Sequence, residues 1–258
     1  MRLNGKQITL IVTLAVLLIA VISCAFIFRV NSIEVNFLVS STRYSDEESV
    51  NKIVKDCQIK KGNSVFLLNK QKVSDELEVD YPYLDIINIE VIFPNIVRIH
   101  CVERIECYAI KLTNNNYAIC DKDLKVLRFS NSTEDMVVIK DGFNSAEIGA
   151  HITYENSCYY SKLIEEFEKF NQTSTSIKFI LQDIELNKVN GANGDEFNLN
   201  ISTDSGINIE IQNIKTAFSN KVYKAYILYS QKINENFSNG IITVGNYSDE
   251  RVFVTYSD

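Results

Sequence analysis

The feature that most constrains this chain is one uninterrupted apolar stretch close to its N-terminus. The stretch runs from Ile8 to Phe28 and contains no charged residue, no proline and no glycine. As an α-helix it would measure about 31 Å, which matches the thickness of the hydrocarbon core of a bilayer. The sequence therefore predicts a membrane-spanning helix over residues 8–28, with a short tail over residues 1–7 and a polar, globular body after the helix.

The distribution of basic residues indicates on which side the body lies. Arg2 and Lys6 precede the apolar stretch, whereas Arg29 and Arg43 follow it among acidic residues. The positive-inside rule then favours a cytoplasmic N-terminus and an extracytoplasmic body on a single-pass protein of the cell membrane. An alternative stays open, because the sequence that ends at Cys24 (VISC) is similar to a lipoprotein cleavage box, which would make Cys24 a lipidated N-terminus.

Charge and cysteine usage exclude several classes of protein. The net charge of −7 gives no general attraction for nucleic acid, so no nucleic-acid partner is expected. The cysteines form no CxxC pair, and His100 and His151 show no metal-site spacing, so no metal is expected. We expect free thiols that act as small apolar side chains, with a disulfide between Cys107 and Cys120 as the alternative.

Residues 31–104 predict a small α+β domain. Apolar and polar residues alternate between Asn31 and Val39, which favours a first strand. Ser45 and Glu48 form a capping box that predicts a helix over about residues 46–56. A second helix is expected over about residues 70–80.

A hairpin completes this domain. Its turn is predicted at Pro94-Asn95, where proline breaks the ladder. The apolar residues before the turn are expected to share one strand face; they are Ile87, Ile89, Val91 and Phe93. The predicted order is strand, helix, helix, strand, strand, with the helices covering one face of a three-stranded sheet.

Residues 105–258 predict a second domain that is mostly antiparallel β with two helices. Helices are expected over about residues 157–170 and 214–233, where apolar residues recur at helical spacing. Strands are expected over residues 107–111, 117–121, 125–129, 136–139, 177–185, 197–201, 207–211, 240–244 and 251–256. The whole chain is therefore predicted as α+β, with an N-terminal transmembrane helix before the two domains.

Three segments of the first domain carry a recognisable pattern. Residues 59–65 (IKKGNSV) are similar to an I-x-x-G-x-x-L segment, and residues 81–84 (YPYL) to a proline step after a second helix. Residues 91–104 (VIFPNIVRIHCVER) are similar to a V-x-x-x-P-x-T-[LV]-x-I-x-V-x-E-R pattern. Together these segments resemble the POTRA domain of the FtsQ/DivIB cell-division family. The chain departs from that family at Phe37, Leu124 and Glu106.

The sequence offers no convincing catalytic set. It contains no G-x-S-x-G, no H-E-x-x-H and no phosphate-binding loop. His100 and Cys101 cannot act together, because adjacent strand residues point to opposite faces. We therefore expect no enzyme activity, no catalytic residue and no cofactor. Glu103-Arg104 is interpreted as a solvated strand end, with a surface that orients the two domains as the alternative.

The last strands of the second domain form the candidate binding site. A terminal strand leaves an open edge, whose backbone N–H and C=O groups can pair with a segment of another protein. We expect this edge at residues 241–244 or 251–256. The candidate contact residues are Ile241, Val244, Tyr247, Val252, Phe253, Val254 and Tyr256. Alternatively, these side chains complete the core of their own domain.

The family resemblance implies a function in cell division. It implies a scaffold at the division septum that binds partners of the FtsB/DivIC and FtsL type outside the membrane. Such a protein helps to control septal peptidoglycan synthesis, with a peptidoglycan synthase complex as a further partner. Two other classes stay open: an anchored wall-binding protein unrelated to division, and a wall-processing enzyme.

Overall fold

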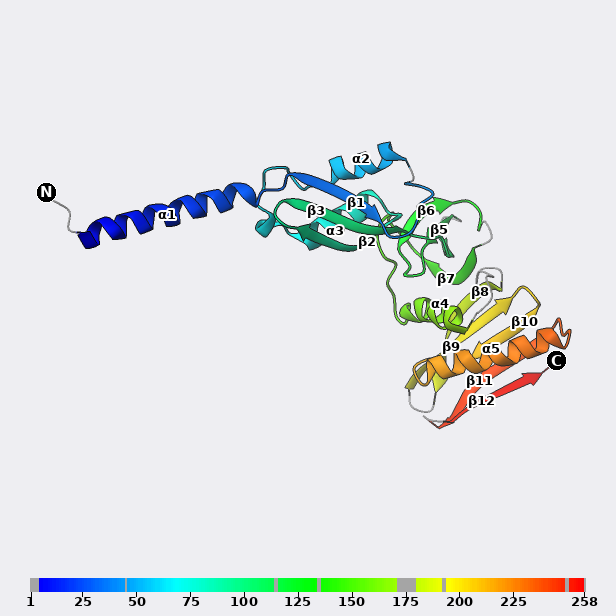
Figure 1. Cartoon of the computed structure of the whole chain (residues 1–258). Helices are drawn as coiled ribbons and strands as arrows, with labels where there is room; N and C mark the ends of the chain where they lie inside the picture. Colours follow the sequence, from blue (N-terminus) through cyan, green and yellow to red (C-terminus); the bar gives the residue numbers. More distant parts are fainter. Residues whose placement is uncertain are drawn as a thin grey trace. The chain divides into compact units, whose positions relative to one another are not determined.

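The chain folds into two compact units, Met1–Arg104 and Ile105–Asp258. Figure 1 shows the computed structural model, which describes residues 5–44, 46–113, 116–133, 136–170, 180–191, 194–248 and 251–257. Each unit has its own cluster of buried apolar side chains. Each unit is therefore described by itself.

The apolar stretch near the N-terminus forms helix α1 (Gly5–Ile27). The predicted membrane-spanning helix over residues 8–28 is nevertheless wrong: among the described residues, no helix is both long and apolar enough to cross a membrane. The single-pass orientation that depended on this helix is not confirmed, and Cys24 lies outside the residues whose side chains are described.

The first unit contains the predicted order of strands and helices. Its elements after α1 are β1 (Ser32–Phe37), α2 (Glu47–Asp56), the 3₁₀ helix η1 (Val65–Leu67), α3 (Lys70–Asp80), β2 (Leu84–Ile92) and β3 (Ile96–Glu103). The sheet order is β1-β3-β2, with β1 parallel and β2 antiparallel to β3. Helices α2 and α3 bury Ile53 and Leu77 in the same cluster as Val97 and Ile99 of β3.

Two local predictions in this unit need correction. The predicted cap residue Ser45 lies outside the described residues, and Asp46 caps α2 by accepting a hydrogen bond from Ser49 N at 2.7 Å. A bulge in β2 between Ile86 and Asn88 changes which residues share a face. As a result Ile89 is buried, whereas Ile87 is exposed. Phe93 lies after the end of β2 and is also exposed.

The end of β3 differs from the predicted solvated strand end. The side chain of Arg104 is only 7% exposed, and its guanidinium pairs with Glu78 at 2.8 Å and with Asp85 at 2.6 Å. Glu103 accepts hydrogen bonds from Ser41 Oγ at 2.8 Å and from Thr42 N at 2.8 Å. Both side chains therefore hold segments of the first unit together.

The second unit is built on one nine-stranded sheet. Its strands are β4 (Tyr108–Leu112), β5 (Tyr117–Cys120), β6 (Val126–Ser130), β7 (Val137–Phe143), β8 (Leu181–Gly191), β9 (Gly194–Thr203), β10 (Ile207–Ile211), β11 (Gly240–Ser248) and β12 (Arg251–Ser257). The sheet order is β12-β11-β10-β9-β8-β7-β4-β5-β6. Pairing is antiparallel except between β4 and β7, β7 and β8, and β10 and β11, so the sheet is mixed but mostly antiparallel.

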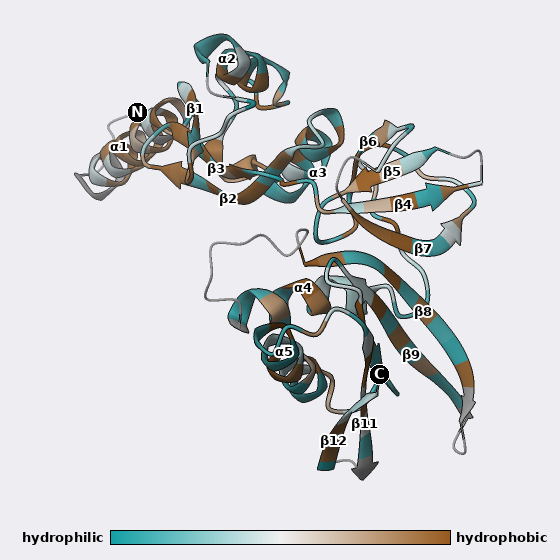
Figure 2. Ribbon diagram, turned by 90° about the vertical axis from the view of Figure 1, so that its right-hand side faces the viewer, coloured by the Kyte–Doolittle hydropathy of each residue, from teal (hydrophilic) through white to brown (hydrophobic). Residues whose placement is uncertain are grey.

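Two helices cover one face of the sheet. They are α4 (Cys158–Phe170) and α5 (Phe218–Asn234), and Figure 2 shows them beside one another on the same side of the strands. Phe167 of α4 and Val222 of α5 share a core with Leu199 and Ile242 of the sheet. The alternation of apolar and polar residues along these strands follows from this one-sided burial.

A buried lysine fixes the turn that leads into α5. Lys221 is fully buried, and its Nζ donates hydrogen bonds to the carbonyl oxygens of Gln212 and Asn213, both at 2.7 Å, and to Thr216 Oγ1 at 3.2 Å. Asn213 and Ala217 have φ of 44° and 48°, a left-handed conformation that non-glycine residues rarely adopt. Lys221 therefore stabilises a strained turn between β10 and α5.

Replacement of Glu103 by glutamine should destabilise the first unit in a pH-dependent way. Burial alone would raise the pKa of Glu103, but hydrogen bonds from Ser41, Arg43 and Thr42 bring it below its ordinary value. The stabilisation is therefore present above the unfolded pKa of about 4.3 and is lost as the pH falls through the lower folded pKa. We expect Glu103→Gln to lower the free energy of unfolding by about 1–2 kcal/mol at neutral pH. Urea unfolding at falling pH checks this; a difference that does not shrink in acid contradicts it.

Replacement of Lys221 by methionine should destabilise the second unit by about 2–4 kcal/mol. Methionine fills a similar volume but donates no hydrogen bond, so the carbonyl groups of Gln212 and Asn213 would stay buried without this donor. Urea unfolding measures the loss. Lys162→Met on the exposed surface of α4 is the matched control and should change stability by less than about 0.5 kcal/mol. Equal effects of the two changes would contradict the role of Lys221.

Candidate partner-binding edge

Strand β12 lies at one end of the nine-stranded sheet. Strand β11 pairs with β10 on one side and with β12 on the other, so it is an interior strand. In the part of the chain that the structure describes, β12 is the last strand of the order. Of the two stretches expected at an edge, residues 251–256 therefore lie at the edge and residues 241–244 do not.

The hydrogen-bond pattern fixes which backbone groups of β12 face outward. The carbonyl oxygen of Val244 accepts a hydrogen bond from Gln212 N at 2.8 Å, so the backbone groups of Val244 face β10. Along a strand these groups alternate in direction, so the backbone of Thr243 faces β12. Val244 lies opposite Val254, and Thr243 lies opposite Thr255. The backbone of Thr255 therefore faces β11, whereas that of Val254 faces the open edge.

A contact from α5 supports the same direction. Lys224 Nζ donates a hydrogen bond to the carbonyl oxygen of Val252 at 2.6 Å. Because Val252 and Val254 are two residues apart, their backbone groups point to the same side. Lys224 thus occupies the outward-facing carbonyl group of Val252 at the start of β12. The backbone groups of Val254 are the next ones that face the open edge. Sequence reasoning missed Lys224, since only the three-dimensional register brings it to β12.

Several candidate contact residues belong to the core of their own unit. Val244 is fully buried and Val252 is 8% exposed, and both lie in the apolar cluster under α5. Val254 and Tyr256 are partly buried against the same cluster. Tyr256 also donates a hydrogen bond from its hydroxyl to the carbonyl oxygen of Asn239 at 2.6 Å. The alternative interpretation, that these side chains complete the core, therefore applies to the inward-facing residues of β11 and β12.

The other candidates lie on the uncovered face of the sheet or outside the description. Ile241 is 45% exposed. Phe253 is half-buried over Gly245, where an added Cβ would come within 2.6 Å of the Phe253 ring. Gly245 therefore makes room for this aromatic side chain beside the edge. Tyr247 belongs to β11, but its side chain lies outside the described residues.

The opposite end of the sheet has a different environment. At β6, the backbone N–H of Val126 donates to the carbonyl oxygen of Ala150 at 2.9 Å, and Gly149 N donates back to Val126 O at 2.8 Å. Lys125 and His151 form a further bridge. Residues 149–151 thus cover the first part of β6. Between the two ends of the sheet, β12 is the better template for an added strand.

Two ionisable groups of the second unit, Asp141 and Cys120, have pKa values that burial raises. The carboxylate of Asp141 accepts hydrogen bonds from the hydroxyls of Tyr160 and Tyr154, and burial raises the pKa of Asp141. Burial also raises the pKa of the Cys120 thiol, which favours its neutral form. Cys120 forms no disulfide, so the alternative of a disulfide between Cys107 and Cys120 is wrong. Within the described residues, no three His, Cys, Asp or Glu side chains gather to hold a metal ion.

Known proteins are similar to part of the first unit. Residues 36–104 match the family model described as "POTRA domain, FtsQ-type". The cell division protein DivIB of Clostridium acetobutylicum is 32% identical over 130 residues, which cover 49% of this chain and 48% of that protein.

A second relative carries a different name. The putative serine/threonine-protein kinase L232 of Acanthamoeba polyphaga mimivirus is 27% identical over 197 residues, which cover 76% of this chain and 28% of that protein. The chain thus spans less than half of the length of either curated relative. The two matches that agree, to the POTRA model and to DivIB, confirm the predicted resemblance: residues 36–104 are an FtsQ-type POTRA domain, and the chain is related to the FtsQ/DivIB family of cell-division proteins.

Proposed function

We propose that this protein is a non-enzymatic scaffold of the division machinery that binds another polypeptide by strand addition at β12. The observation that carries the proposal is the direction of the Val254 backbone, whose N–H and C=O groups face the open edge of the sheet. Main-chain hydrogen bonds to such an edge supply affinity, and neighbouring side chains supply specificity. Phe253, over Gly245, offers an aromatic contact on the uncovered face beside the incoming strand.

The relatives suggest which partners come to this edge. The POTRA match and the relationship to DivIB support a role in cell division. We propose partners of the FtsB/DivIC and FtsL type, a location at the division septum beside the membrane, and a contribution to the control of septal peptidoglycan synthesis. The share of DivIB that is covered is 48%, so these partners are proposals for this chain.

The kinase-named relative does not lead to a second proposed function. The match covers only 28% of that protein, and the chain lacks a glycine-rich phosphate-binding loop in its sequence. Phosphoryl transfer depends on groups that hold the phosphates and a metal ion in position. Nothing in the described geometry favours that chemistry over polypeptide binding.

Replacement of Val254 by proline should abolish binding while leaving the fold intact. Proline removes the outward N–H and brings its ring to the edge, but it leaves the N–H groups that face β11 in place. Affinity for the cognate DivIC-type partner, measured by isothermal titration, should fall by at least about tenfold, as expected for lost backbone hydrogen bonds plus a steric clash.

The matched control is Val254→Ala, which shortens the same side chain and keeps the N–H group. It should bind within about threefold of the unchanged protein, because the ladder hydrogen bonds stay available. Circular dichroism melting verifies that both variants are folded. Unchanged affinity of a folded Val254→Pro protein would show that the partner does not add a strand at β12.

A further inference from the structure

An aromatic cluster projects from one end of the first unit, beside the end of α1. We call it the aromatic tip; it consists of Phe28, Phe66, Leu67 and Phe93. The ring centroids of Phe28 and Phe66 are 5.2 Å apart, and those of Phe66 and Phe93 are 6.1 Å apart. Phe66 is 66% exposed, Leu67 85% and Phe93 63%. A cluster of large, exposed apolar side chains marks a surface that binds another protein or a membrane.

The fold holds these side chains outward. Val65, the first residue of η1, is buried, and its N–H donates to the carbonyl oxygen of Phe28 at 3.0 Å. The hydroxyl of Ser64 accepts a hydrogen bond from Phe66 N at 3.3 Å and caps the short helix. With Val65 fixed in the core, the next two side chains, Phe66 and Leu67, point to solvent. The exposure of the aromatic tip is therefore built into the backbone.

The segment that carries η1 is basic. Residues 57–74 contain Lys60, Lys61, Lys70 and Lys72 and no acidic residue, although the chain as a whole carries a net charge of −7. Lys60 and Lys61 are exposed. They lie in the turn that docks on the chain after α1, where Gly62 N donates to the carbonyl oxygen of Val30 at 2.8 Å. The aromatic tip thus has a basic border on an otherwise acidic protein.

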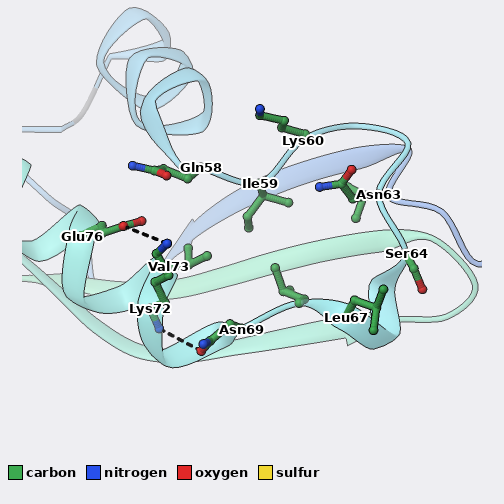
Figure 3. A pocket seen from close by; sticks show the side chains of 12 residues that line it. Gln58, Ile59, Lys60, Asn63, Ser64, Leu67, Asn69, Lys72, Val73 and Glu76 are labelled. Atoms are coloured by element: carbon green, nitrogen blue, oxygen red, sulfur yellow. Dashed lines mark hydrogen bonds and ion pairs between the residues drawn. The ribbon is translucent and has the colours of Figure 1, made fainter.

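A hollow of about 380 Å³ adjoins this border, and Figure 3 shows its lining. Lys60 extends away from the ribbon, and Leu67 and Ser64 lie at the η1 end of the hollow. Lys72 is directed along α3 toward Glu76, at 3.7 Å. Lys72 is therefore partly neutralised by Glu76, whereas Lys60 and Lys61 are exposed and form no ion pair within the described part of the chain.

We propose that the aromatic tip inserts into the headgroup region of an anionic lipid bilayer, with Lys60 and Lys61 beside the lipid phosphates. Aromatic side chains favour the interface between hydrocarbon and water, and basic residues near it are attracted to anionic headgroups. Two observations select a bilayer as the occupant. The border is basic, and the tip continues into the exposed apolar residues Phe26 and Ile27 at the end of α1. This surface is separate from β12 and does not depend on the proposed strand addition.

The chain contains no tryptophan, so a single introduced tryptophan reports on its own position. The full chain carrying Phe93→Trp is mixed with vesicles made of equal amounts of phosphatidylglycerol and brominated phosphatidylcholine. We expect a shift of the emission to shorter wavelength and at least about twofold more quenching than with unbrominated vesicles. Leu67→Trp is a second reporter on the aromatic tip and should behave in the same way.

Phe129→Trp in β6 is the matched control, because Phe129 is also an exposed phenylalanine, at 42%. Its fluorescence should respond little to the bromine atoms. Adding Lys60→Gln and Lys61→Gln to the Phe93→Trp protein should lower the vesicle partition coefficient by about fivefold per lysine. Equal quenching of the tip and control reporters would overturn the proposal. A concentration-dependent shift without vesicles would also overturn it, because it would indicate self-association through the tip.

Discussion

The hydrogen bond from Gln212 N to the carbonyl oxygen of Val244 sets the direction of the backbone groups at the end of the large sheet. Because neighbouring residues in a strand alternate in direction, this one bond turns Thr243 toward β12. The register between β11 and β12 then turns Thr255 inward and Val254 outward. The capacity of this sheet to accept a further strand depends on that alternation.

The surroundings of the edge determine how it can be used. α5 covers one face of β12, so Val252 and Val254 contribute their side chains to the core and only their backbone to the edge. Lys224 from the same helix covers the Val252 carbonyl, which limits where an incoming strand can begin. The turn before α5 is held by the buried Lys221. The core therefore uses the side chains of β12, whereas the proposed strand addition would use its backbone, so one can be changed without the other.

Much of the fold follows from local sequence patterns. The alternation of Ile207, Ile209 and Ile211 predicts a half-buried strand, and these residues do form β10 with buried side chains. The hairpin at Pro94 and the helices over about residues 157–170 and 214–233 are predicted for similar reasons. The helices form as α4 and α5, and α5 begins four residues later than predicted. These predictions are correct because a strand or helix that buries one side carries apolar residues at the period of its own geometry.

The remaining features depend on contacts between distant residues, which no local pattern contains. The sequence predicts that Arg104 is solvated at a strand end. In the structure, Glu78 of α3 and Asp85 of β2 form ion pairs with its guanidinium. The alternation of apolar residues predicts that Ile87 points into the core, but a bulge in β2 places it on the surface. The sequence allows an edge strand at residues 241–244 or at residues 251–256. The pairing of β11 with β10 shows that residues 241–244 lie in an interior strand. The long apolar run predicts a membrane span that the described helix does not provide.

Amide hydrogen exchange at Val254 and Thr255 tests the central claim most directly. In the free protein the Val254 amide should exchange rapidly, since it faces the open edge, and the Thr255 amide should exchange slowly within the ladder. When the DivIC-type partner binds, the Val254 amide should become protected and the Thr255 amide should stay protected. Binding that leaves the Val254 amide as fast as before would contradict an account based on strand addition at β12.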